Sequence, residues 1–76
     1  MRERGLQELD VCGLPPPEPF ERIMHALASL PAESALQVRI HREPYPLYDV
    51  LRDNGYAWHT TPLADGSYSI RISRSA

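Results

Sequence analysis

LDVCGLPPPEP, residues 9–19, joins a strand-like segment to a helix-like segment. Leu9 and Val11 are alternate apolar positions, which predicts a strand over Leu6–Val11. The prolines that follow lack a backbone N–H, so they end the strand and favour the start of a helix. Apolar side chains then recur at helical spacing and predict a helix over Phe20–Leu30. They are Phe20, Ile23, Met24, Leu27 and Leu30.

The rest of the chain predicts one more helix and three strands. Leu36–His41 alternates as a strand, and Leu47–Asn54 has the apolar spacing of a short helix that ends before Gly55. Two further strands, Tyr56–Leu63 and Ser67–Ser73, flank a hairpin turn at Asp65-Gly66. Each helix has one apolar stripe and each of the last three strands has one apolar face. This pattern predicts an α/β two-layer sandwich of order β-α-β-α-β-β, with a mixed four-stranded sheet and both helices on one face.

The connection through the first helix indicates where a site should lie. Two strands joined by a helix are expected to pair in parallel with a right-handed crossover. The loop after the first strand and the loop after the second, residues 12–18 and 42–46, must then emerge at the same edge of the sheet. Ligands of α/β proteins bind preferentially at such an edge.

Length and composition limit the function classes. The chain has 76 residues and is expected to form a single domain over 1–76, with a core of about 6–73, a frayed lead-in at 1–5 and a short tail at 73–76. A net charge of −2 argues against a general nucleic-acid binder. One cysteine excludes an internal disulfide and a cysteine-based zinc site. No apolar run reaches membrane-spanning length and none resembles a signal peptide, so we expect a cytoplasmic protein.

The order of elements, the stretch at 9–19 and the Asp-Gly hairpin together resemble the TusA/SirA-like superfamily. This resemblance implies the two-layer fold predicted above. TusA-type proteins are sulfur carriers that hold a persulfide on a cysteine followed by Pro, any residue, then Pro. Here Pro17 and Pro19 match that motif, and Pro16 stands at the cysteine position.

A cysteine-less branch of the superfamily is closer still. This bacterial domain family of unknown function is marked by LDV..LPPPE and by an REP.PLY-like segment, which residues 42–48, REPYPLY, resemble. Its members stand alone or accompany metal-binding and redox modules. The resemblance therefore implies the fold and a kind of partner, without the residue that carries sulfur.

The prolines of the opening stretch favour a structural interpretation. Pro16, Pro17 and Pro19 remove up to three of the N–H donors that make a helix start an anion site. Glu18 adds a carboxylate at the positive end of the helix, which is favourable by about 0.3–1 kcal/mol. Cys12 is the alternative, because a thiol at a strand end near a helix start can become nucleophilic. It lies four residues before Pro16, roughly 13 Å of extended chain, so it would act as a relocated thiol.

The histidines and the open face of the sheet predict neither a metal site nor an RNA platform. His25 is expected on the solvent side of its helix, and His41 and His59 on the open face, with no third ligand at useful spacing. RNA-binding sheets expose aromatic side chains, whereas the aromatic residues of these strands are expected in the core. These are Tyr56, Trp58 and Tyr68. The predicted open face consists of Gln37, Arg39, His41, His59, Ser69 and Arg71.

Our hypothesis is a non-catalytic binding or regulatory module that recognises a partner or ligand at the edge formed by residues 12–18 and 42–48. We expect no cofactor, no metal, no nucleic acid and no membrane, with a protein partner such as a redox or metal-binding module, and a monomer or weak dimer. The predicted contact residues are Cys12, Pro16, Pro17, Glu18, Arg42, Glu43, Tyr45 and Tyr48. Three alternatives remain open. The second loop could be a rigid connector with an Arg42–Glu43 ion pair, and the chain could be a persulfide carrier that uses Cys12. It could also associate with a metal or haem through the surface histidines His41 and His59.

Overall fold

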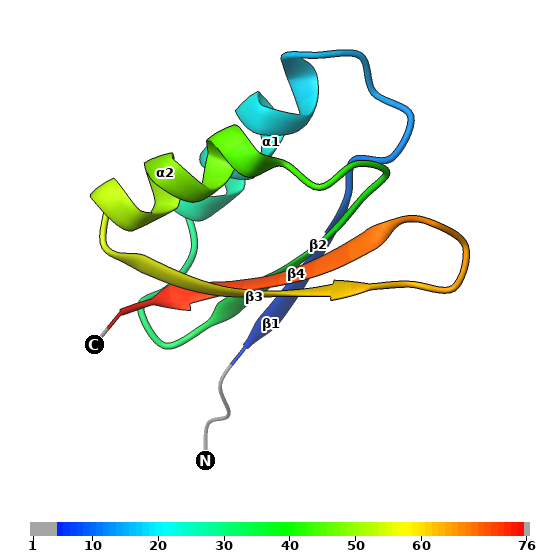
Figure 1. The fold of residues 1–76 in the computed structure, drawn as a ribbon. Helices are drawn as coiled ribbons and strands as arrows, with labels where there is room; N and C mark the ends of the chain where they lie inside the picture. The colour runs from blue at the N-terminus through cyan, green and yellow to red at the C-terminus, as the bar shows by residue number, and fades with distance from the viewer. Residues whose placement is uncertain (1–4, 76) are drawn as a thin grey trace.

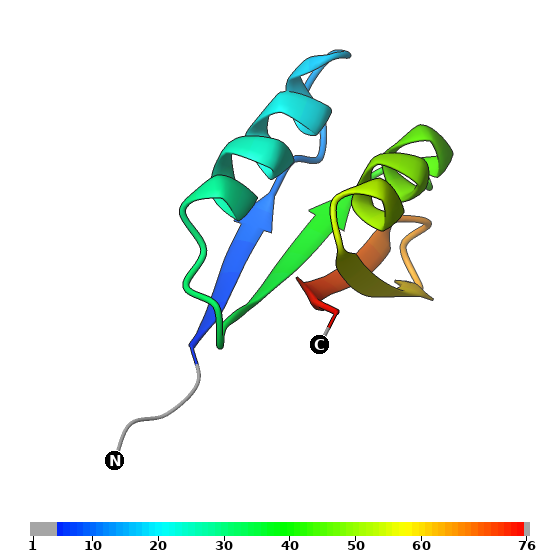
Figure 2. The same ribbon diagram turned by 90° about the vertical axis from the view of Figure 1, so that its left-hand side faces the viewer.

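Two helices cover one face of a four-stranded sheet (Figures 1 and 2) in the computed structural model, which describes residues 5–75. The elements run in the order β1 (Leu6–Asp10), α1 (Glu18–Ala28), β2 (Ala35–Ile40), α2 (Tyr45–Asp53), β3 (Tyr56–Pro62) and β4 (Tyr68–Arg74). This confirms the predicted α/β two-layer sandwich. The expected lead-in at 1–5 falls outside the described residues apart from Gly5.

The sheet is mixed, and its strand order is β1-β2-β4-β3. Strands β1 and β2 are parallel, with Leu9 opposite Val38, whereas β4 pairs antiparallel with both β2 and β3. Because β1 and β2 are parallel, the segments that follow them leave from the same edge, as expected. This edge also holds the starts of both helices (Figure 2).

The core lies between the sheet and the two helices. The inner face of the sheet supplies residues such as Val38 and Ile70, and the helices supply Ile23, Leu27 and Leu51. Every member of the buried cluster is at most 5% exposed. Burying a side chain of this size stabilises the fold by about 1.5–3 kcal/mol, so the shared apolar face holds the two layers together.

Both helices begin earlier than the sequence predicts, and each start contains proline. Helix α1 begins at Glu18, with Pro17 at the N-cap and Pro19 in the first turn. Helix α2 begins at Tyr45, again with proline at the N-cap and in the first turn. The first turn of a helix has no partner for its N–H groups, so proline is accommodated there without loss of a hydrogen bond. Proline therefore stands both directly before each helix and within its first turn.

Two other expectations are wrong in detail. Phe20, predicted on the buried stripe of α1, is 39% exposed because it lies in the first turn, beyond the part of the helix that the sheet covers. The sequence predicts that the last strand ends at Ser73, where a tail would begin, but β4 continues to Arg74, and Ser73 pairs with Ala57 within it. Tyr56, Trp58 and Tyr68, expected in the core, are partly buried and pack against the buried cluster.

The predicted turns are confirmed. Gly55 and Gly66 have φ angles of 80° and 91°, in the region that glycine adopts without strain. In the β3–β4 hairpin, Asp65 accepts hydrogen bonds from the amide and the hydroxyl of Ser67. Within residues 5–75, no helix is both long enough and apolar enough to cross a membrane.

Replacing Leu51 with alanine tests the packing of α2 on the sheet. Leu51 is fully buried, so Leu51→Ala should lower the free energy of unfolding by about 2–5 kcal/mol in urea titrations. Leu6→Ala is the matched control, because Leu6 is 46% exposed, and it should change the value by no more than about 0.5 kcal/mol. Equal losses in the two variants would contradict this core.

Candidate functional site

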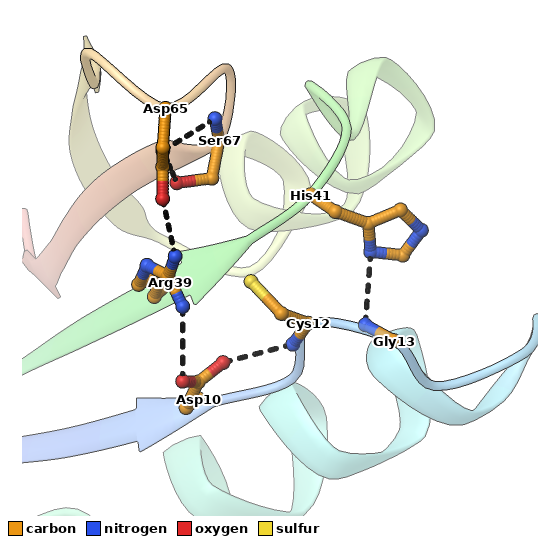
Figure 3. A network of polar contacts seen from close by, with 7 residues as sticks. All are labelled: Asp10, Cys12, Gly13, Arg39, His41, Asp65 and Ser67. Carbon is orange, nitrogen blue, oxygen red and sulfur yellow. Dashed lines mark hydrogen bonds and ion pairs between the residues drawn. The ribbon is translucent and has the colours of Figure 1, made fainter.

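The loops after β1 and β2 are bonded to each other at the shared edge. Val11 donates its backbone N–H to the carbonyl oxygen of Arg39 at 2.9 Å, which extends the parallel pairing beyond β1. One step further, the Gly13 amide donates to Nδ1 of His41 at 3.4 Å (Figure 3). The two segments that the topology brings to one edge are thus in direct contact.

A cleft of about 510 Å³ opens between the starts of α1 and α2, and we call it the proline cleft. Residues of both loops and both first turns line it, and most of them are apolar. The lining is Leu14, Pro16, Pro17, Pro19, Phe20, Ile23, Ile40, His41, Arg42, Glu43, Pro44, Pro46 and Leu47. Its volume lies within the range of small-molecule and peptide side-chain sites.

The two helix starts that flank the cleft have the same sequence pattern, Pro-x-Pro. In α1 the pattern is Pro17-Glu18-Pro19, and in α2 it is Pro44-Tyr45-Pro46. Proline has no N–H, and the neighbouring amides are used locally: Glu18 donates to Pro15 at 2.9 Å and Tyr45 to Glu43 at 3.1 Å. These helix starts therefore present ring carbons to the cleft in place of the N–H groups that bind phosphate elsewhere.

Of the residues predicted at this edge, four line the cleft and four do not. Pro16, Pro17, Arg42 and Glu43 belong to the lining. Cys12, Glu18, Tyr45 and Tyr48 lie outside it. The predicted contact residues omit nine lining residues, although four of these, Leu14, Pro44, Pro46 and Leu47, lie within the predicted edge of residues 12–18 and 42–48. The repeated Pro-x-Pro pattern is a signal that could have found the prolines among them. The nine omitted residues are Leu14, Pro19, Phe20, Ile23, Ile40, His41, Pro44, Pro46 and Leu47.

Glu43 is held by two tyrosine hydroxyls. Tyr45 donates to Oε1 and Tyr48 to Oε2, both at 3.0 Å. Within residues 5–75, Arg42 forms no ion pair with Glu43 or any other acid, so the Arg42–Glu43 pair of the connector interpretation is wrong. The Glu43 carboxylate is hydrogen-bonded within the chain, whereas the Arg42 side chain is exposed.

Tyr48 connects the second loop to the sheet. Its hydroxyl also lies 2.6 Å from the Thr60 hydroxyl, and its ring stacks on Trp58 with centroids 5.2 Å apart and planes 9° apart. Burial raises the pKa of Tyr48, and so does the carboxylate of Glu43. Tyr45 packs edge-on against the Tyr48 ring but remains 66% exposed. Tyr48 therefore supports the wall of the cleft from behind, and Tyr45 extends apolar surface beside it.

The environment of Cys12 does not activate the thiol. Partial burial raises the pKa of Cys12, and a hydrogen bond to Asp10 raises it further, while the charge of Arg39 acts in the opposite direction. The Cys12 amide donates to Oδ1 of Asp10 at 2.9 Å, which fixes the turn after β1 (Figure 3). A relocated nucleophile would need a lowered pKa.

Arg39 forms a bridge across the open face that the sequence did not reveal. Its guanidinium contacts Asp10 at 3.2 Å and Asp65 at 2.5 Å, joining the end of β1 to the β3–β4 hairpin (Figure 3). Hydrogen bonds from the hydroxyl and amide of Ser67, and then that from Arg39, hold the pKa of the Asp65 carboxyl well below its usual value. The charge of Arg39 is thus compensated. Arg71 is also exposed on this face and, within residues 5–75, forms no ion pair.

The three histidines do not form a cluster, because they lie on α1, on the loop after β2 and on β3. His41, predicted on the open face, lies in the loop and turns toward Gly13, because β2 ends at Ile40 and strand alternation no longer sets its direction. His25 is exposed on α1 and His59 is exposed on β3 opposite Arg71. No group of three residues that could ligate a metal ion lies within residues 5–75.

Comparisons with known proteins agree on the fold. A family model described as "Uncharacterized conserved protein (DUF2249)" matches residues 8–74. The crystal structure of a SirA-like protein from Desulfitobacterium hafniense superposes with a TM-score of 0.79 at 22% sequence identity, over 93% of this chain and 99% of that chain. No curated protein matches significantly. The TusA/SirA-like fold expected from the sequence is therefore confirmed.

Removing the Tyr48 hydroxyl tests the support behind the cleft. Tyr48→Phe leaves Oε2 of Glu43 and the Thr60 hydroxyl without their Tyr48 partner, while Tyr45 still bonds Oε1. The free energy of unfolding should therefore fall by about 1–2 kcal/mol in urea titrations. Tyr45→Phe removes one exposed hydrogen bond to the same carboxylate and should cost no more than about 0.5 kcal/mol. A larger loss of unfolding free energy in Tyr45→Phe than in Tyr48→Phe would show that Tyr45, and not Tyr48, supports the cleft wall.

The reactivity of Cys12 can be measured by alkylation. With iodoacetamide at pH 7.5, the native thiol should react several times more slowly than the same thiol in urea, because partial burial and Asp10 raise its pKa. Intact mass spectrometry against time gives both rates. Native labelling that is faster than in the unfolded chain would show an activated thiol and would revive the persulfide-carrier interpretation.

Proposed function

The chain belongs to the DUF2249 family of uncharacterized conserved proteins, and on this premise we propose that it is a non-catalytic binding module whose partner sits in the proline cleft. The observation that carries the proposal is the cleft itself, an apolar hollow of about 510 Å³ at the edge where the topology joins two loops. The prolines of its walls are conformationally restricted, so little ordering entropy opposes binding.

A protein partner suits this edge better than an isolated small molecule. Three large apolar side chains are exposed within residues 5–75, and two of them, Phe20 and Tyr45, lie at or beside the cleft. Exposed apolar surface concentrated in one place is typical of protein interaction sites. The apolar contact area therefore continues beyond the hollow.

The position of Pro16 supports binding over sulfur transfer. We infer that the chain belongs to the cysteine-less branch of the superfamily, in which a proline stands where TusA-type carriers have the thiol. Pro16 lines the cleft, so an apolar ring occupies the position of the reactive group. From the same resemblance we propose a bacterial, cytoplasmic protein whose partner is a redox or metal-binding module.

Binding of small fragments tests whether the cleft is a binding site. A panel of apolar and aromatic fragments, followed in amide NMR spectra, should shift residues 14–23 and 40–47 together. Phe20→Ala removes part of one wall and should weaken this binding about threefold or more, with the fold unchanged, because Phe20 contributes to the lining while remaining exposed.

Leu6→Ala is the matched control, because Leu6 has similar exposure at the far end of β1. Fragment binding should be the same in Leu6→Ala and in the unmodified protein. Fragments that shift other regions, or that bind Phe20→Ala as tightly as the unmodified protein, would refute the cleft as the binding site.

A further inference from the structure

We propose that the partner segment in the proline cleft is an apolar stretch of peptide that carries one carboxylate side chain, and that this carboxylate pairs with Arg42. The inference rests on the proposed function and adds the chemistry of the occupant. It follows from the charges of the lining, from the two helix starts and from the apolar surface around the hollow.

The two charged residues of the cleft lining differ in whether they are free to pair with a ligand. Only Arg42 and Glu43 carry a full charge among the lining residues. Both oxygens of the Glu43 carboxylate accept hydrogen bonds from tyrosine hydroxyls, whereas Arg42 is exposed and forms no ion pair within residues 5–75. A guanidinium with free N–H groups binds a carboxylate through two parallel hydrogen bonds. Glu43 keeps its negative charge within these hydrogen bonds, and Arg42 is the charged residue of the lining whose donors are free to pair with a ligand.

His41 adds a second donor to the same side of the cleft. Its Nδ1 accepts the Gly13 amide, so in the neutral ring the hydrogen is on Nε2. His41 lines the cleft next to Arg42, and its Nε2–H is a donor that this bond leaves available. A hydrogen-bond acceptor on the ligand, such as a carboxylate, would pair with both the His41 Nε2–H and the Arg42 guanidinium.

The start of α2 favours an anion at the same end. Helix α1 has Glu18 and Glu21 in its first turn, which compensate its positive end, whereas the first turn of α2 has no acidic residue. Arg42 lies just before α2, so its guanidinium and the positive end of this helix have the same sign. The carboxylate beside them, that of Glu43, accepts hydrogen bonds from Tyr45 and Tyr48 of the helix. Pro44 and Pro46 at this start cannot donate the backbone hydrogen bonds that hold a free phosphate or sulfate.

The surroundings of the hollow indicate a peptide. A small carboxylate would contact only Arg42 and its neighbours. Phe20, 39% exposed, and Tyr45, 66% exposed, offer further apolar surface that only a longer ligand could cover. A peptide with several apolar side chains and one acid complements both this apolar surface and the free guanidinium of Arg42. A peptide that carries lysine in place of the acid would be repelled by Arg42. It would also find the Glu43 carboxylate already hydrogen-bonded to Tyr45 and Tyr48.

Selection from a phage-displayed library of random 12-residue peptides tests this inference. The unmodified protein should enrich peptides in which Asp or Glu is adjacent to apolar residues. The tightest peptide is then synthesised with its acid and with the corresponding amide, and both are titrated calorimetrically. The amide should bind about fivefold more weakly, and the difference should shrink as NaCl is raised.

Variants assign the effect to the cleft and to one charge. The acid and amide peptides should bind equally to Arg42→Gln. Arg22 is an exposed arginine on α1 that does not line the cleft, so Arg22→Gln should keep the fivefold difference between the two peptides. Peptides that need Phe20 but bind Arg42→Gln unchanged would overturn the carboxylate inference and leave the proposed function intact. Peptides that bind Phe20→Ala unchanged, or no enrichment at all, would overturn both.

Discussion

Strands β1 and β2 pair in parallel from Leu6↔Ala35 to Asp10↔Arg39, and the position of the candidate site depends on this pairing. A parallel pair needs a crossover, and α1 provides it on the covered face of the sheet. The crossover brings the carboxyl ends of both strands, and hence the starts of both helices, to one edge. An antiparallel pairing of the same strands would have placed the two proline-rich loops at opposite ends of the sheet.

The Pro-x-Pro pattern at both helix starts then determines what this edge can bind. A helix start without proline would present N–H groups and suit an anion, as in phosphate sites. Here the two first turns present rings, and the polar groups of the lining that remain free belong to the side chains of His41 and Arg42. Tyr48 fixes the second loop from behind, through Glu43, Thr60 and Trp58. The proline cleft is therefore an apolar hollow with a charged margin.

The sequence predicted the order of the elements, the covered face and the edge that holds the cleft, because all three follow from local periodicity and crossover handedness. It did not predict that Phe20 is exposed or that His41 turns toward Gly13. Periodicity fixes directions only within regular elements, and both residues lie at element ends. The Arg39 bridge was also missed, because it requires the β2–β4 adjacency that brings the hairpin alongside Arg39.

The central claim is that the proline cleft receives the partner. Intermolecular nuclear Overhauser effects between a bound partner peptide and the methyl groups of the protein test it most directly. The account predicts contacts from the peptide to Leu14, Ile40 and Leu47, which line the cleft. Contacts instead to Leu6 of β1 and Ala57 of β3, both exposed and away from the cleft, would contradict it.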